Sequence, residues 1–416
     1  MSVPTIQVLV GFEQTTGFAT PFLLDSATYG KLGTGTLGGI EMVDLTAMVQ
    51  SISITRGRNR NTEAFNSGTA QVTFHDPTRQ LDPMNEDSVY YPYVGPRQPI
   101  QIIAGGDCVI YTGTIHDWNL EYDYVGTGNV MVASCSDSFA VLAQMTMNAW
   151  TPAEQTSGQR IEAVLSRPDI EYQGGRNLDT GRSTLGGTPG GGGIWDIQES
   201  TNVLQYLQRV EASEAGFLFM DVNDNVRFVQ RFTLPNAAVM MEFTEDGTGI
   251  PYSSLTNQFG DENLYNYVHM QSPAGAVQDA SDTQSIARYQ SQDFSKFDLL
   301  NSTTGEVLNL AYRFLAVHKD PFVRFTGVSV QLAGMDATDQ RTLICAELCN
   351  IATVQKSFAT GSPASVTETL LVSGIAHEIR PGDHRVRFTF ESIDTRAFFV
   401  LDSALLGILD TNLLAF

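Results

Sequence analysis

Residues 51–58 read Ser-Ile-Ser-Ile-Thr-Arg-Gly-Arg, and residues 68–74 read Gly-Thr-Ala-Gln-Val-Thr-Phe. Apolar and polar side chains alternate in both stretches, which is typical of strands with one buried face. The first run is broken at residues 56–59, Arg-Gly-Arg-Asn, and Pro77 ends the second. The two stretches therefore predict a strand, a turn and a second strand.

The same pattern continues toward residue 140. Alternating runs are expected as strands at residues 99–104, 108–116, 118–124 and 130–134, and Gly-Thr-Gly-Asn at 126–129 is a strong hairpin signal. Short strands separated by glycine-rich turns are typical of sandwiches and barrels. The first 140 or so residues are therefore predicted to be all-β.

Helical periodicity then replaces alternation. It is found at residues 138–144, 157–165 and 201–214, and the last of these carries Leu204, Leu207 and Val210 on one stripe. Two short strands, 216–220 and 226–231, are expected to flank a turn at 221–225. A further helix is predicted at 304–316, then strands at 324–332, 368–372 and 384–391, with a helix inserted at 339–351.

The expected fold class is mainly β with an α+β middle. We place the domain boundaries at residues 1–145, 146–300 and 301–416. A glycine-rich stretch at 186–193 inside the middle domain is most simply a flexible surface loop.

The amino-acid composition and the net charge disfavour some classes of function. The formal net charge is −22, with only 24 basic residues, which disfavours a nucleic-acid reader. Such acidity suits a channel through which DNA slides without binding, and solubility alone accounts for it equally well. The first ten residues carry no basic segment and no long apolar core, and no stretch reaches the length of a membrane span. Synthesis in the cytoplasm with reduced thiols is therefore expected.

The four cysteines are Cys108, Cys135, Cys345 and Cys349. Cys345 and Cys349 are four residues apart and are expected on one face of the helix at 339–351. That spacing offers two metal ligands, but no second pair accompanies it, so packing in the core is preferred.

Known catalytic motifs are incomplete. His377-Glu378 opens like a zinc-protease motif, but Pro381 stands where the second histidine must be. Residues 181–183, Gly-Arg-Ser, resemble the start of a nucleophile elbow without its closing glycine. Asp221, Asn223 and Asn225 have calcium-loop spacing, yet the required glycine and glutamate are missing, so a hairpin turn is preferred. We therefore predict no catalytic, cofactor-binding or metal-binding residues, and no enzyme.

The order of several segments resembles phage tail hub and minor tail proteins, especially those of long-tailed phages of actinobacteria. The similar stretches are residues 51–58, 68–74, 79–85 (Arg-Gln-Leu-Asp-Pro-Met-Asn), 90–93 (Tyr-Tyr-Pro-Tyr), 97–102, 111–115, 211–230, 261–268, 372–382, 399–402 and 407–410. In this resemblance His377 is a turn residue between strands.

The resemblance implies two tail-tube-like β-barrel domains that flank a smaller α+β region. Three copies would present six barrels and adapt a sixfold tail tube to a threefold tip, as a hub at the distal end of the virion tail and part of the DNA-ejection channel. The implied partners are two further copies of the chain, a distal tail or tail tube protein, the tape measure protein, and tail-tip, fibre or receptor-binding proteins. Assembly would take place in the cytoplasm of the host bacterium.

Two alternatives remain open. One is a hexameric distal tail protein with a carbohydrate-binding role, in which Trp118, Trp150 or Trp195 stacks on sugars, although burial is the commoner fate of tryptophan. The other is a glycan hydrolase acting at the host surface, for which the 46 acidic residues always provide some carboxylate pair.

Overall fold

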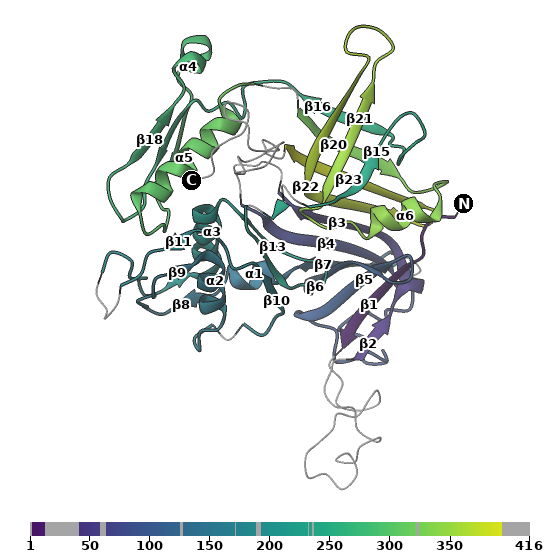
Figure 1. Ribbon diagram of the computed structural model, residues 1–416. Coiled ribbons are helices and arrows are strands. Elements are labelled where there is room, and N and C mark those ends of the chain that lie inside the picture. The colour runs from purple at the N-terminus through teal and green to yellow at the C-terminus, as the bar shows by residue number, and fades with distance from the viewer. Residues whose placement is uncertain are drawn as a thin grey trace.

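The computed structural model describes residues 2–12, 41–58, 64–124, 128–170, 172–188, 193–231, 233–234, 237–321 and 324–392. Within these ranges thirteen strands belong to one continuous sheet. Figure 1 shows the N-terminal half of this sheet in purple and blue and the C-terminal half in teal to yellow, with strands β3 and β22 where the halves meet. The fold is mainly β, as predicted.

The N-terminal half contains seven strands in the order β3-β4-β7-β6-β5-β1-β2. Their bounds are β1 Ile6–Phe12, β2 Glu41–Asp44, β3 Val49–Gly57, β4 Asn66–His75, β5 Gln98–Ala104, β6 Cys108–Glu121 and β7 Val130–Ser136. The alternation at 51–55 and 70–74 is therefore a pair of strands, as predicted. The runs at 108–116 and 118–124, expected as two strands, are one long strand, because the β6–β7 pairing continues across the register shift between Ile115 and Asp117.

The C-terminal half contains six strands and one helix. They are β15 Val239–Phe243, β16 Ser254–Gln258, β20 Arg324–Gln331, α6 Ala337–Ile344, β21 Ile351–Ser357, β22 Ser365–Arg380 and β23 Asp383–Ser392. The helix predicted at 339–351 is thus shorter: it ends at Ile344, and Cys349 has a left-handed φ of 65° that no α-helix continues through.

Strand β22 joins the two halves. Residues 365–371 pair with β21, and residues 374–379 pair with β3, with a register shift in the β23 pairing between Val372 and Gly374. The halves therefore share one hydrogen-bonded sheet. Among the described residues this sheet does not close into a barrel, so the expected barrels are seen as two curved halves of an open sheet.

A first α+β module follows β7. Its helices are α1 Ser138–Leu142, α2 Ser157–Leu165 and α3 Val203–Glu214, and its strands are β8 Thr146–Met147, β9 Gln155–Thr156, β10 Arg176–Leu178, β11 Thr184–Leu185, β12 Thr201–Asn202, β13 Phe217–Met220 and β14 Val226–Val229. Helix α3, predicted from residue 201, begins at Val203, because the Asn202 side chain accepts a hydrogen bond from the Gln205 amide (3.0 Å) and caps the helix. The predicted strand–turn–strand at 216–231 is the β13–β14 hairpin.

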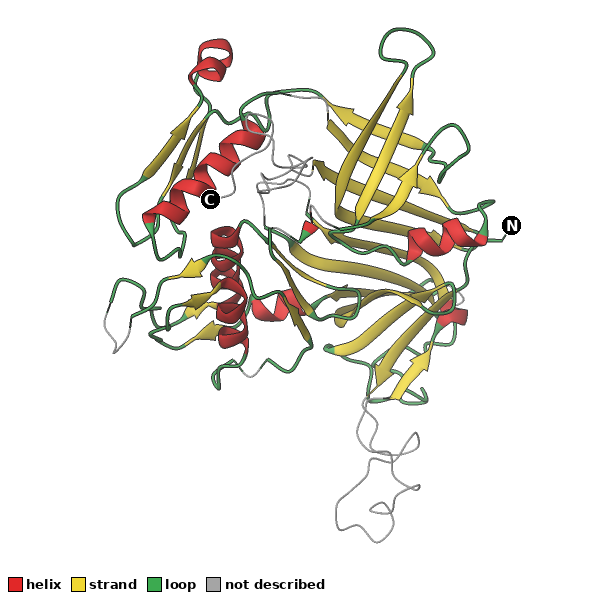
Figure 2. Cartoon of the chain, viewed as in Figure 1, coloured by secondary structure: helices red, strands yellow, loops and turns green. Residues whose placement is uncertain are grey.

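A second α+β module packs around its own apolar cluster. It contains β17 Tyr267–Met270, β18 Gln278–Ser281, α4 Thr283–Tyr289, β19 Asp293–Lys296 and α5 Thr304–His318. Val268, Leu299 and Leu310 belong to this separate cluster, in which α5 covers the small sheet. Figure 2 shows α1–α5 on the left of the molecule and the large sheet, with α6 beside it, on the right. The domain boundaries at 145/146 and 300/301 remain predictions.

Candidate functional site

The motifs that suggested chemistry form ordinary structural contacts. Among the described residues, no group of three His, Cys, Asp or Glu side chains is placed to hold a metal ion. No helix within the described ranges is long and apolar enough to cross a membrane. The predicted turn at 221–225 is the β13–β14 hairpin turn, in which the Asp221 carboxylate accepts hydrogen bonds from the amides of Asn223 and Asn225.

His377 is not a turn residue, as the resemblance implied, but a buried residue inside strand β22. The turn comes four residues later, at Pro381 and Gly382, where the chain reverses into β23. The Nδ1 atom of His377 lies 3.1 Å from Nε2 of His384 on the neighbouring strand. Burial lowers the pKa of His377 well below its usual value and that of His384 to about 4, so both rings are neutral near pH 7.

Ser183 belongs to a buried polar network rather than to a nucleophile elbow. Its hydroxyl donates to the carbonyl oxygen of Ser213 (2.8 Å) and accepts from Arg231. Beside it, the buried Glu214 carboxylate accepts hydrogen bonds from the Ser157 hydroxyl (2.8 Å) and from the Ser183 amide (2.7 Å). These contacts tie α2 and residues 181–183 to the end of α3.

The expectation of four reduced thiols is wrong for two of the cysteines. Cys108, at the start of β6, forms a disulfide with Cys345, at the C-cap of α6, with a Cα–Cα distance of 5.4 Å that lies within the usual range for a disulfide. Cys135 and Cys349 are free and buried, as core packing requires. The disulfide adds a covalent link between the two halves of the sheet.

The three tryptophans are half-buried against the protein's own groups. Trp118 donates from Nε1 to the Gly95 carbonyl oxygen (2.8 Å), and the Arg167 guanidinium lies 4.9 Å from the Trp150 ring centroid. Trp195 contacts Gly186 closely enough that a Cβ on that glycine would clash. The stacking of tryptophans on sugars therefore gains no support.

Two buried arginines connect the halves of the sheet. Arg58 forms a bidentate ion pair with Glu391 of β23, with Nε–Oε1 at 2.8 Å and Nη2–Oε2 at 2.7 Å. Arg56 bonds Glu347 (2.7 Å) and the Met220 carbonyl oxygen (2.8 Å). Planar guanidinium groups suit such paired contacts, which fix orientation as well as distance.

The sequence contains a signal for these buried arginines. Ile52 and Ile54 face the core, and Arg56 shares their side of the strand because side chains alternate with period two. A cation at the end of a buried apolar row predicts a buried anionic partner. Local pattern does not identify the partners, because Arg56 pairs with Glu347 and Arg58 pairs with Glu391, which is 333 residues away.

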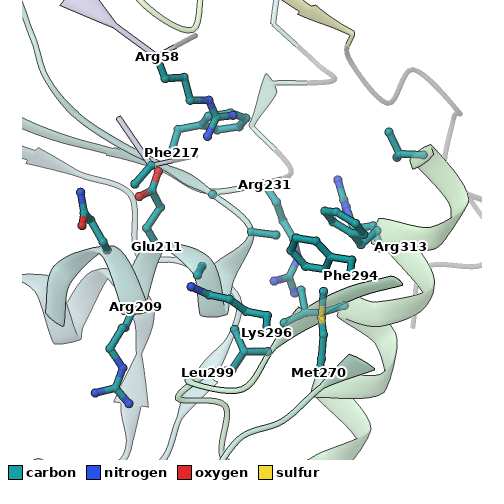
Figure 3. Close-up of a pocket in the computed structure, with 18 of the residues that line it drawn as sticks. Arg58, Arg209, Glu211, Phe217, Arg231, Met270, Phe294, Lys296, Leu299 and Arg313 are labelled. Atoms are coloured by element: carbon teal, nitrogen blue, oxygen red, sulfur yellow. The ribbon is translucent and has the colours of Figure 1, made fainter. Parts of the chain in front are cut away.

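A cavity of about 590 Å³ opens beside this junction, between α3 of the first module and α5 and β19 of the second. Figure 3 shows the side chains that line it. We call it the basic pocket, because its lining includes five cations: Arg58, Arg209, Arg231, Lys296 and Arg313.

Carboxylates and aromatic rings complete the basic pocket. Its acidic lining residues are Glu211, Asp298 and Glu391. Full burial raises the pKa of Glu211 to about 7, so this carboxyl is partly protonated at neutral pH. The rings of Phe294 and Phe314 stack with centroids 4.0 Å apart.

No protein-family model matches the sequence, and no curated protein matches it. Solved structures do match. The 43 kDa tail protein of prophage MuSo2 from Shewanella oneidensis superposes with a TM-score of 0.56 at 14% identity, over 94% of this chain and 98% of that chain. The chain has a tail-protein fold.

A second solved tail protein gives the same result. The tail protein from Neisseria meningitidis MC58 superposes with a TM-score of 0.56 at 9% identity, over 94% of this chain and 96% of that chain. At these identities the likeness lies in the fold. The narrower resemblance to hub proteins of actinobacteriophages remains a prediction.

Proposed function

We propose that this chain is a structural protein of a phage tail and forms a trimeric hub at the distal end of the tail tube. The observation that carries the proposal is the likeness to a prophage tail protein over nearly all of both chains, 94% and 98%. The shared fold thus includes both halves of the sheet and both α+β modules.

The continuous sheet suits a load-bearing ring component. Each chain contributes two curved sheet halves, and their β3–β22 pairing, buried ion pairs and disulfide hold them as one unit. Three such units would present six sheet halves, which is the number needed to stack on a sixfold tube. The hub would adapt that symmetry to a threefold tip.

Charge supports passage of DNA without binding. Three copies at −22 each have a formal charge of −66, and carboxylates facing a channel would repel the phosphate backbone. Tail tube or distal tail protein would dock on one face of the ring, and tip, fibre or receptor-binding proteins on the other. The tape measure protein would end at the hub.

Copy number tests this proposal. Quantitative mass spectrometry of purified parent particles should give three copies of the chain per tail, measured against a virion protein of known copy number. Six copies per tail would contradict the trimer and favour the hexameric distal tail protein. Absence from the particle would contradict both and return attention to an enzyme at the host surface.

A gene disruption adds a functional readout. Particles produced without the chain should lack complete tail tips in electron micrographs, and a plasmid copy should restore them. Complete, infectious tails in its absence would overturn a structural role.

A further inference from the structure

The C-terminal half of the large sheet has an open seam. Its strands follow the order β15-β21-β22-β23-β20-β16, so β15 and β16 are its edges within the described part of the chain. A pocket of about 600 Å³ lies on this seam, between β16 and the hairpin of β21 and β22. Figure 1 shows this hairpin at the top of the molecule, with β16 beside it. We call it the seam pocket, and its size and its place at the mouth of a curved sheet are typical of small-ligand sites.

Two aromatic rings present apolar surface to the seam pocket. Phe358 is 45% exposed, yet its backbone is held, because its amide donates to the Ala364 carbonyl oxygen (2.9 Å) at the neck of the hairpin loop. Tyr252 is half-buried, and its hydroxyl donates to the Gln355 carbonyl oxygen of β21 (3.1 Å). Held rings of this kind offer flat, electron-rich faces on which the C–H groups of a ligand can pack.

The charges of the lining nearly cancel. Lys356 is ion-paired with Glu245, whose carboxylate also accepts a hydrogen bond from the Ser357 amide (3.0 Å). Glu368 is the remaining charged residue of the lining. An anion would find one lysine that already has a partner, and an organic cation would meet the ammonium of that lysine. The lining therefore favours an uncharged occupant.

The other polar groups of the seam pocket suit the hydroxyls of a ligand. Glu368 accepts a long hydrogen bond from the Phe325 amide (3.4 Å), and a carboxylate has capacity for further donors. Burial raises the pKa of Glu368, because water solvates this carboxylate incompletely. Asn257 on the edge strand β16 adds an amide, and Thr360 in the hairpin loop adds a hydroxyl. Amides and hydroxyls both donate and accept, as the hydroxyls of a ligand do.

We propose that the seam pocket binds a neutral saccharide. A sugar ring packs its C–H face on Phe358 and Tyr252, and its hydroxyls bond to Glu368 and Asn257. Sugars combine an apolar C–H face with uncharged hydroxyls at the rim of the ring, which matches the aromatic and polar groups of this lining. This binding role is separate from the trimeric hub. It also differs from stacking on tryptophan, because none of the three tryptophans lines the seam pocket.

Saturation-transfer difference NMR of the purified full-length chain tests this. The probes are neutral di- and trisaccharides built from glucose, galactose, mannose, rhamnose and N-acetylglucosamine, with choline and glucose 6-phosphate as charged probes. The proposal predicts signal from at least one neutral saccharide, strongest at the C–H protons of one ring face. Lack of signal from every neutral saccharide, or a stronger signal from a charged probe, overturns it.

Substitutions then locate the site, with the affinity of the best probe measured by calorimetric titration. Phe358→Ala should weaken binding about tenfold or more, whereas Phe358→Trp keeps a flat ring and should retain it. Phe297→Ala is the matched control, because Phe297 is 55% exposed and lies outside the lining, and it should leave the affinity unchanged. Undiminished binding after Phe358→Ala, or equal weakening by the control, overturns the proposal.

Two polar variants test the hydrogen bonds. Glu368→Gln should weaken binding about threefold or more, because an amide accepts hydrogen bonds less strongly than a carboxylate. Asn257→Ala, on the exposed edge strand, should weaken it by a similar factor and keeps the test decisive if Glu368→Gln does not fold. Full affinity in a folded variant of either kind would contradict the assigned contacts.

Discussion

Arg58 and Glu391 form a buried ion pair across the junction of the two sheet halves. Both side chains are buried, with 8% and 10% exposure, and Arg58 also lies 4.7 Å above the Phe65 ring. Burying two charges is costly, so such a pair contributes orientation more than net stability. Removing one partner, however, leaves the other charge buried and unpaired.

Glu391→Gln should therefore destabilise the chain by about 3 kcal/mol. Urea unfolding of the purified protein measures this as a lower midpoint. Asp107→Asn breaks a pair of similar geometry whose side chains are 57% and 59% exposed, and it should leave the midpoint unchanged. Equal effects of the two substitutions would contradict the role assigned to the buried pair.

Glu211 should make stability depend on pH. Its pKa of about 7 in the folded chain lies above the usual glutamate value of 4.5, so between these two pH values the folded state binds a proton that the unfolded state releases. The free energy of unfolding is then highest below the pKa that Glu211 has in the unfolded chain. It falls by about 3 kcal/mol as pH rises to the pKa of Glu211 in the folded chain, and it stays constant above that pH.

Glu211→Gln should remove that fall, since the amide cannot ionise. Unfolding free energies of both proteins at pH 5, 6, 7 and 8 give the comparison, and their difference isolates Glu211 from other groups. Burial lowers the pKa of His318 to about 4. The contribution of His318 to stability therefore changes in the opposite direction and is lost as pH falls from 6.5 toward 4. Parallel pH profiles for the two proteins would contradict the prediction.

At the scale of elements, the β3–β22 pairing requires a glycine at its end. Gly57 has a φ of 108°, and a Cβ there would lie 2.2 Å from the Ser373 carbonyl oxygen. Gly57→Ala should lower stability by about 2–3 kcal/mol through strain and displacement of β22. Gly95→Ala is the control, because no atom lies within 4 Å of its added Cβ. Differential scanning calorimetry compares the two, and equal midpoints would refute the close approach.

The disulfide between β6 and α6 should be detectable directly. Peptide mapping of the air-oxidised protein without reductant should yield Cys108 linked to Cys345, with Cys135 and Cys349 as free thiols. The link closes a loop of 237 residues, so Cys345→Ala should lower the unfolding temperature under oxidising conditions but not with reductant present. Free thiols at all four positions after oxidation would contradict this pairing.

Elements with a local signal were predictable from the sequence. Strands β3 and β4 follow from alternation, and α2 and α3 from periodicity with a cap. Local pattern did not predict β17–β19 and α4, because their apolar runs are short and mixed with polar residues. It predicted that α6 continues to residue 351, beyond its C-cap at Cys345. His377 was misplaced because Pro381 and Gly382 mark the turn only once the long strand before them is known.

The basic pocket could not be predicted, because its cations come from five different places in the chain. Arg58, Arg209, Arg231, Lys296 and Arg313 are distributed over β3, α3, β14, β19 and α5 or their ends. No spacing relates them in sequence, and only the packing of two modules beside the sheet junction brings them together. The same non-local pairing accounts for the ion pair between Arg58 and Glu391.

At the scale of the whole molecule, the continuous sheet and the acidic net charge are the two features on which the proposed role in the tail depends. The sheet runs through both halves, and the buried pairs at its centre resist separation of those halves. In the proposed ring, such units would transmit force, and the charge of −22 per chain would keep the lumen acidic.

The most direct test of the central claim is a cryo-EM reconstruction of the tail tip of the parent particle. The account predicts three copies of this chain in a ring at the distal end of the tube, with six sheet halves stacked on the sixfold tube. Six copies in that ring, or a position elsewhere in the particle, would contradict it.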